Sequence, residues 1–200
     1  MILGLTGSPG SGKSTVARMI SALSGAPVID ADEIAHQVQR RGGPAFAGIV
    51  AEFGDEILGP DGEIDRHRLA QIVFGDPTRL ARLNAIVHPK VRAEELWLID
   101  ENRNRPLVIF MVPLLFENGL EKLTDRVAAV VTQDARRRER LKRRSGWSDS
   151  EISARLAAQL PDAEKIKRAD FVIDNSGSLE ETERQVRELL SSLGCRLQAS

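Results

Sequence analysis

The segment GSPGSGKS, Gly7 to Ser14, is the feature that most limits what this chain can fold into. It matches the pattern G-x-x-x-x-G-K-[ST] in full, through Gly7, Gly12, Lys13 and Ser14. An apolar stretch precedes the segment and apolar residues at helical spacing follow it, which is the context in which this pattern forms a phosphate-binding loop. Such a loop joins a strand to a helix, so the chain is expected to begin with an α/β layer.

This loop provides several groups that can hold phosphate oxygens. Glycine allows the backbone turns that aim N–H groups at an anion, and the start of the following helix adds its positive dipole end. Lys13 is expected to reach the β- and γ-phosphates, and the Ser14 hydroxyl is expected to ligate Mg²⁺. A glycine-rich turn without a ligand is the alternative, but spacing, lysine, serine and context all favour the phosphate site. The predicted nucleotide-binding residues here are Gly7, Gly10, Ser11, Gly12, Lys13, Ser14 and Thr15.

Short apolar runs bounded by loop signals predict the strands of this layer. Continuous runs such as VIFMV and VAAVV are typical of strands covered on both faces, which favours a parallel sheet. Helical patterns fill the gaps, and the alternation predicts a doubly wound α/β domain with right-handed crossovers. The predicted strands are Ile2–Thr6, Pro27–Asp30, Leu107–Val112, Arg126–Thr132 and Asp170–Asp174.

The gap from Ala31 to Arg105 is too long for a simple crossover and contains only helical patterns and loops. It predicts a helical subdomain, about 31–104, inserted between the second and third strands, within which Pro89 is expected to break or restart a helix. The other predicted parts of this single domain, 1–200, are a core at about 1–30, 105–133 and 161–200 and an arginine-rich lid at about 134–160.

Charge and cysteine content exclude several other classes of protein. The formal net charge of −1 gives no basic field for nucleic acid or anionic lipid, and no stretch approaches the roughly 18 apolar residues of a membrane span. The single cysteine, Cys195, cannot form an intrachain disulfide, as expected in a reducing compartment. We therefore expect a soluble, cytoplasmic protein. A monomer or a weak homo-oligomer is expected, although charge and cysteine content do not bear on this point. His36, His67 and His88 lack the spacing of a metal site.

The segment VIDADEIA places two carboxylates after the second predicted strand, at the start of a helix. Helix capping by Asp30 and a dipole contribution from Asp32 explain both residues without any chemistry. For Asp32 we prefer a second role, because the ligand crevice of such a sheet lies at the carboxyl ends of the strands. An acid there can orient an attacking hydroxyl and accept its proton. Spacing alone leaves both roles open.

An arginine-rich helix is predicted after the fourth strand, with Arg136, Arg140 and Arg144 on one face. A solvated basic helix or a nucleic-acid patch is the alternative, although the absence of interleaved aromatic residues disfavours the patch. Arginine's planar fork suits the oxygens of a migrating phosphoryl group. A break at Ser145-Gly146 before a second helix predicts a helix pair that closes over a nucleotide and excludes water. The charge run alone does not decide between these interpretations.

Several segments together resemble one family, the dephospho-CoA kinases. The resemblance covers nearly the whole chain and rests on GLTGSPGSGKSTVA, VIDADEIA, LNAIVHPKV, VPLLFENGL, LAAQLP and ADFVIDNSG, in that order. It implies a P-loop kinase fold: a five-stranded parallel sheet flanked by helices, a helical substrate-binding insert and a helical lid. It also implies transfer of the γ-phosphoryl group of ATP, with Mg²⁺, to the ribose 3′-hydroxyl of dephospho-CoA, which gives CoA and ADP.

The resemblance also implies roles for individual residues. The family's proposed base falls on Asp32 and its lid arginines on Arg140 and Arg144, so the implied catalytic residues are Lys13, Asp32 and Arg140. Asn175 falls in the loop expected near the adenine of ATP, where a turn residue is equally comfortable. For His88 a packed structural histidine is the alternative, and for the apolar acceptor residues it is core burial. The implied acceptor site comprises Asp32, His88, Pro113, Leu115, Phe116 and Glu117.

The chain departs from the family pattern at two places. Ser8-Pro9 replaces the common Gly-Ile inside the loop, and Pro9 removes one backbone donor. Met111 stands where many members carry an aspartate, so carboxylate help to Mg²⁺ from the third strand is doubtful. Ser14, the phosphates and waters are then expected to hold the ion, with Asp32 acting through a water.

Two other functions share part of this pattern. A kinase of the same architecture that acts on a nucleoside monophosphate would differ in its acceptor site. A nucleotide-dependent switch or nucleic-acid ATPase is disfavoured, because the guanine-reading NKxD element is not found and the charge is near neutral.

Overall fold

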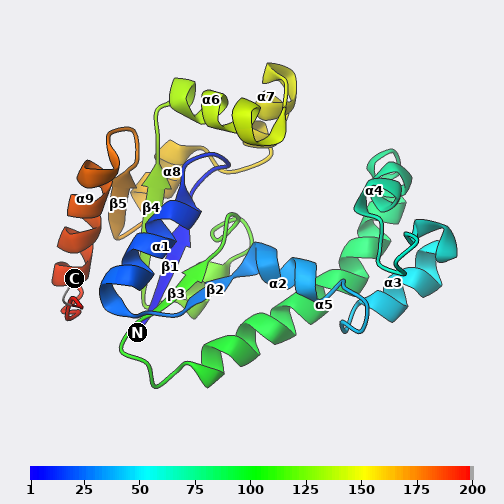
Figure 1. The fold of residues 1–200 in the computed structure, drawn as a ribbon, viewed down its shortest axis with the longest axis horizontal. Helices are drawn as coiled ribbons and strands as arrows, with labels where there is room; N and C mark the ends of the chain where they lie inside the picture. The colour runs from blue at the N-terminus through cyan, green and yellow to red at the C-terminus, as the bar shows by residue number, and fades with distance from the viewer. Residues whose placement is uncertain (199–200) are drawn as a thin grey trace. The chain divides into compact units, whose positions relative to one another are not determined.

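The structure, a computed structural model, describes residues 1–198 and, within them, every side chain except that of Phe74. The chain divides into two compact units, Met1–Asp30 with Glu101–Ser200, and Ala31–Asp100 (Figure 1). In the described part of the chain, no helix is long and apolar enough to cross a membrane. Each unit is described by itself below.

The first unit is built on a five-stranded sheet in which every strand pairing is parallel, in the order β2-β3-β1-β4-β5. The predicted strands are confirmed, with ends that differ by at most one residue. β1 is central and pairs with β3 on one side and β4 on the other, so the loop that follows β1 begins in the middle of the sheet's carboxyl edge. The strands are β1 (Ile2–Thr6), β2 (Val28–Asp30), β3 (Val108–Met111), β4 (Arg126–Val131) and β5 (Phe171–Asp174).

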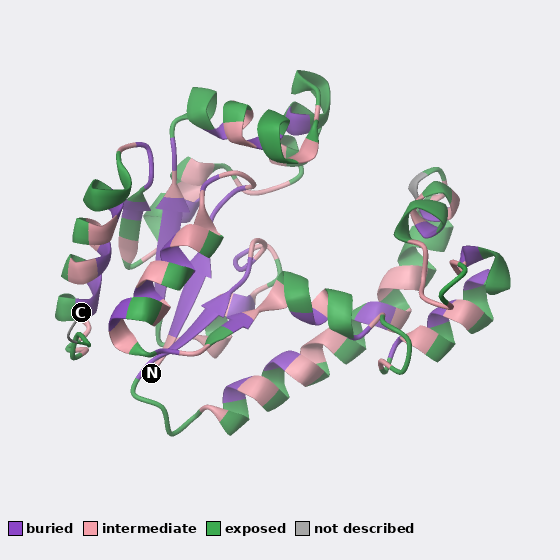
Figure 2. Cartoon of the chain, viewed as in Figure 1, coloured by how far each residue is buried: buried purple, intermediate pink, exposed green. Residues whose placement is uncertain are grey.

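Helices α1 (Lys13–Ser24) and α9 (Leu179–Ser192) pack together on one face of this sheet (Figure 1). The core between them includes Leu5, Ile20 and Val186, which are fully buried. Figure 2 shows the central strands of the sheet largely in purple, the colour of buried residues. The other face is covered in part by the segment after β3, which carries a short 3₁₀-helix, Leu120–Leu123. The remaining helices of the unit are α6 (Asp134–Ser145), α7 (Asp149–Ala157) and α8 (Asp162–Arg168).

The second unit, Ala31–Asp100, contains helices and loops in its described residues, with one antiparallel bridge between Leu58 and Ile64. Asp65 caps one of its helices by accepting hydrogen bonds from the backbone N–H groups of His67 and Arg68, which satisfies two first-turn donors. Its elements are α2 (Ala31–Gln37), α3 (Phe46–Phe53), a 3₁₀-helix (Asp55–Ile57), α4 (Arg66–Phe74) and α5 (Pro77–Glu101).

Helix α5 runs without interruption through Pro89, so the prediction that this proline breaks or restarts a helix is wrong. A proline inside a helix removes the hydrogen bond from its own nitrogen to the carbonyl of residue i−4, here Ala85, and strains that turn. In a helix of 25 residues, the turns on both sides keep their own hydrogen bonds. The local penalty at Pro89 is therefore not sufficient to end the helix.

Candidate active site

The loop between β1 and α1 adopts a conformation that only glycine supports. Gly7, Gly10 and Gly12 have φ angles of 151°, 76° and 97°, which L side chains rarely adopt. A Cβ atom at Gly7 would overlap the carbonyl oxygen of Val130, and one at Gly12 would overlap the side-chain amide of Asn175. The glycines of the sequence pattern are thus required both by backbone angle and by close approach of neighbouring segments.

Lys13 and Ser14 occupy the first turn of α1. The Lys13 Nζ atom donates hydrogen bonds to the carbonyl oxygens of Gly7, at 2.7 Å, and Ser8, at 3.3 Å, so its ammonium group lies over the loop. Ser14 is exposed in the same turn. Because first-turn N–H groups have no carbonyl partner within the helix, this end of α1 is a ready anion site.

Ser11 adds a further polar group inside the loop. Its side chain is fully buried, and its hydroxyl has no hydrogen-bond partner among the residues that the structure describes. Its backbone carbonyl, by contrast, accepts hydrogen bonds from two segments outside the loop, through Asn175 and Arg140. The loop is therefore held in place from outside at Ser11.

Arg140 is the lid arginine that reaches the phosphate loop. Its Nη2 atom lies 3.0 Å from the carbonyl oxygen of Asn175, and its Nη1 atom lies 3.5 Å from that of Ser11. The predicted basic helix is confirmed as α6, but its arginines diverge at their tips. Arg136 contacts the carbonyl oxygen of Gly177, and the exposed Arg144 contacts the hydroxyl of its neighbour Ser145.

Asn175 has both ends of its side-chain amide bonded within the protein. Its Nδ2 atom donates to the Ser11 carbonyl at 2.8 Å, and its Oδ1 atom accepts from the Thr182 hydroxyl at 3.1 Å. Asn175 and Thr182 are both buried, so these bonds lie out of solvent. The contact of this segment with adenine stays a prediction. In the structure, the Asn175 side chain joins the phosphate loop to α9.

The segment after β3 contributes packing and backbone acceptors. The Pro113 carbonyl accepts from the Thr6 hydroxyl at 3.1 Å, close to the end of β1. The side chains of Leu115 and Phe116 are buried, as the core-burial alternative predicts. The Phe116 ring also lies 5.2 Å from the guanidinium of Arg168 on α8. This segment is therefore well anchored beside the sheet.

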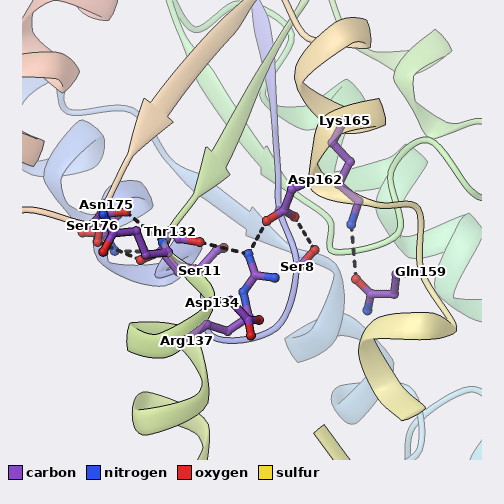
Figure 3. Close-up of polar contacts among 12 residues, drawn as sticks. Ser8, Ser11, Thr132, Asp134, Arg137, Gln159, Asp162, Lys165, Asn175 and Ser176 are labelled. Carbon is purple, nitrogen blue, oxygen red and sulfur yellow. Dashed lines mark hydrogen bonds and ion pairs between the residues drawn. The ribbon is translucent and has the colours of Figure 1, made fainter. Parts of the chain in front are cut away.

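Glu117 and Lys165 form an ion pair at the end of the helix pair α6–α7. The Glu117 Oε1 atom accepts from the backbone N–H of Leu160 at 2.8 Å and lies 3.4 Å from Lys165 Nζ. Lys165 Nζ also donates to the side chain of Gln159, at 3.2 Å (Figure 3). Burial lowers the pKa of Lys165, and the nearby Glu117 carboxylate acts in the opposite direction. The pair fixes the point where the chain leaves α7 for α8.

Two of the predicted acceptor residues lie in the helical unit. Asp32 is exposed in the first turn of α2, which begins directly after Asp30, the last residue of β2. The capping role of Asp30 stays a prediction. His88 is exposed on α5, so it is not the packed histidine of the alternative interpretation. Among the described residues, no group of three or more His, Cys, Asp or Glu side chains could hold a metal ion.

Several residues that shape this site carry no signal in the sequence. Arg137 is buried although its neighbours on α6 are mostly exposed, and its Nη2 atom pairs with Asp162. An acidic residue in the first turn of a helix, such as Asp162, is common for dipole reasons alone. In the sequence, nothing distinguishes Thr182 and Lys165 from other helix residues. Only their three-dimensional neighbours distinguish them.

Comparison with known proteins identifies the family. A family model described as dephospho-CoA kinase matches residues 1–181. The chain is 49% identical over 187 residues to a dephospho-CoA kinase from Symbiobacterium thermophilum, an alignment that covers 92% of this chain and 78% of that protein.

Two solved structures agree over nearly their full length. TT1252 from Thermus thermophilus matches with a TM-score of 0.80 and 40% identity, covering 96% of this chain and 97% of that one. Dephospho-CoA kinase from Campylobacter jejuni matches with a TM-score of 0.73 and 29% identity, covering 96% of each chain. The chain therefore belongs to the dephospho-CoA kinase family of ATP-dependent phosphotransferases.

Proposed function

We propose that this chain transfers the γ-phosphoryl group of ATP to the ribose 3′-hydroxyl of dephospho-CoA, which gives CoA and ADP. The observation that carries the proposal is the meeting of two cations at one phosphate loop in a member of this family. Lys13 lies over the loop carbonyls and Arg140 contacts the loop from α6. Phosphoryl transfer proceeds with negative charge spread over the equatorial oxygens, and fixed cations stabilise that charge.

Asp32 is the proposed general base of the acceptor. Its exposed carboxylate lies two residues after the last residue of β2, in the first turn of α2, and the match of VIDADEIA to the family pattern supports this role. It takes the proton of the 3′-hydroxyl as the oxygen forms its bond to the γ-phosphorus. The bond between the γ-phosphorus and the bridging oxygen breaks, and ADP leaves with that oxygen.

The remaining residues divide between donor and acceptor. The proposed acceptor residues are His88, Pro113 and Glu117, and Leu115 and Phe116 support the segment after β3 by packing. Arg144 is proposed to join the nucleotide when the pair α6–α7 closes, and the Asn175 segment to border the adenine. The proposed donor residues of the loop are Gly7, Gly10, Ser11, Gly12, Lys13, Ser14 and Thr15.

An acceptor panel tests this function directly. Dephospho-CoA, AMP and CMP are compared as acceptors in one coupled assay of ADP formation. We expect kcat/KM for dephospho-CoA to exceed that for either nucleotide by about 100-fold or more, because unmatched polar groups in an acceptor site are costly. A preference for AMP or CMP would show a nucleoside monophosphate kinase instead. ADP formation that nucleic acid stimulates without any acceptor would show an ATPase.

Mg²⁺ is the proposed cofactor, held by Ser14, the ATP phosphates and water. The fit rests on the exposed Ser14 hydroxyl at the first turn of α1, since hard oxygen donors and substrate phosphates are the usual ligands of this ion. When bound, the ion neutralises charge on the phosphates. Met111 at the end of β3 offers no carboxylate there.

Ser14→Ala is expected to raise the Mg²⁺ concentration that half-saturates ATP binding by about tenfold or more, as removal of a ligand to a charged group does. Equilibrium ATP binding is titrated with Mg²⁺, so the readout does not require turnover. Ser21→Ala, two turns further along α1, is the matched control and should leave the titration unchanged. Identical titrations in Ser14→Ala and wild type would remove Ser14 from the metal site.

We further propose that the protein acts in the cytoplasm, as a monomer or a weak homo-oligomer. ATP is available there, and Cys195 is a free thiol in keeping with a reducing compartment. The two cations at the phosphate loop come from one chain, which supports a site that does not need a second copy.

A further inference from the structure

Three segments that are distant in the sequence meet at the carboxylate of Asp162 (Figure 3). Its Oδ1 atom accepts a hydrogen bond of 2.6 Å from the Ser8 hydroxyl in the phosphate loop. Its Oδ2 atom forms an ion pair with Nη2 of Arg137 on α6. Asp162 itself stands in the first turn of α8, the helix that follows the α6–α7 pair.

The burial of these groups makes the contact energetically important. Ser8 and Arg137 are 3% and 7% exposed, and the Asp162 side chain is 22% exposed. The Arg137 Nη2 atom also donates to the Thr132 carbonyl at 3.2 Å, but its Nε atom has no hydrogen-bond partner in the described part of the chain. A buried cation that loses its carboxylate is left uncompensated, so α6 depends on Asp162 for its position.

This contact lies next to both cations of the proposed reaction. Arg137 and Arg140 are three residues apart on α6, so their side chains are neighbours on the helix surface. On the loop side, the carbonyl of Ser8 is one of the two that accept hydrogen bonds from Lys13. A shift of α6 against the loop would therefore change the distance between Lys13 and Arg140.

The helix also packs directly on the loop at this point. A Cβ atom built on Gly10 would lie 2.9 Å from the Cγ atom of Leu141 and 3.1 Å from that of Arg137. The loop and α6 thus approach as closely as a glycine allows, and Asp162 bonds to both sides of this approach. Because closely packed elements do not deform freely, a shift of α6 at this contact would also shift the phosphate loop.

We propose that Asp162 is a positioning residue for phosphoryl transfer, which holds α6 against the phosphate loop so that Arg140 and Lys13 converge on the same phosphoryl group. The proposal rests on the proposed function for the reaction that it serves. Asp162 touches neither substrate nor reacting atoms in this role. It acts through Arg140.

The test compares Asp162→Asn, Arg140→Ala and the double variant in the full-length chain. Asp162→Asn keeps an acceptor for Ser8 but loses the ion pair, and we expect kcat to fall by about 30- to 100-fold, the scale of a small misplacement of catalytic groups. Arg140→Ala alone is expected to lower kcat by about 100-fold. Because Asp162 acts through Arg140, the double variant should lie within about threefold of Arg140→Ala alone.

Two control variants separate positioning from general damage. Glu164→Gln removes an acid whose side chain is 47% exposed on the same helix, where it pairs with Lys167, and should keep kcat within about twofold. Asp162→Glu retains the charge and should recover part of the lost kcat. Full kcat in folded Asp162→Asn, or a double variant whose loss equals the product of the single losses, would overturn the proposal.

A second variant covers the case in which Asp162→Asn does not fold. Ser8→Ala leaves the ion pair intact and removes one hydrogen bond, so kcat should fall by about three- to tenfold, again without a further loss in the Arg140→Ala background. If wild type does not phosphorylate dephospho-CoA, the proposed function fails. The same variants are then compared by acceptor-free ADP release, which also depends on Lys13 and Arg140, so unchanged release would still overturn the role of Asp162.

Discussion

Asp32→Asn is expected to lower kcat for phosphorylation of dephospho-CoA by about 1,000-fold, because loss of a general base typically costs 10²- to 10⁴-fold. An amide keeps the size of the side chain and can still orient the hydroxyl, but it cannot take the proton. The dissociation constant of ATP should stay within about twofold, since the proposed donor groups lie in the loop and α6. Steady-state kinetics and equilibrium ATP binding on the same preparation measure both quantities.

Glu33→Gln is the matched control for this variant. Glu33 is also exposed in the first turn of α2, so its substitution removes the same charge from the same helix end. We expect it to keep kcat within about twofold, because the dipole contribution of one exposed acid is small. Full turnover in Asp32→Asn would leave Asp32 with its helix-dipole role alone.

Lys13→Met is expected to abolish measurable transfer, with a loss in kcat/KM of about 1,000-fold or more, because a preorganised cation at the migrating group supplies several kcal/mol. Unlike Asp32→Asn, this variant should also weaken ATP binding, since the ammonium group is held over the loop carbonyls where phosphate is proposed to lie. Lys13→Arg should recover little of the activity, because a planar guanidinium does not replace a compact ammonium group.

Lys167→Met makes the same chemical change at a distant position. Lys167 is exposed on α8 and pairs with Glu164 at 2.7 Å, and such surface pairs contribute little. Its kinetics and ATP binding should match wild type. If Lys13→Met bound ATP and turned over as well as Lys167→Met, the loop would not be the donor site.

The fold was predictable in large part because its signals are local. A continuous apolar run shows a strand buried on both faces, and the predicted strand ends differ from the observed ones by at most one residue. The sequence also predicted that the long gap from Ala31 to Arg105 is helical. The continuation of α5 through Pro89 was not predicted, because it depends on the sum of many hydrogen bonds along one helix rather than on the proline itself.

The candidate site divides in the same way. Gly7, Gly12, Lys13 and Ser14 are set by a pattern whose spacing carries the chemistry, and the structure adds the reason that each glycine is required. The arginine run, by contrast, offered three candidates on one face. Arg140 is the one that contacts the loop carbonyl of Ser11, which depends on how α6 leaves β4 and packs on the loop.

By itself, the sequence determined the phosphate loop, the parallel sheet and the family, because these depend on residue type, periodicity and order along the chain. Only the tertiary structure decided that Asn175 holds Ser11 and that Asp162 joins Ser8 to Arg137. Each of these contacts links residues that are far apart in the chain. A hydrogen bond or ion pair between distant residues leaves no periodic trace in the sequence, so it becomes visible only when folding brings the two groups within bonding distance.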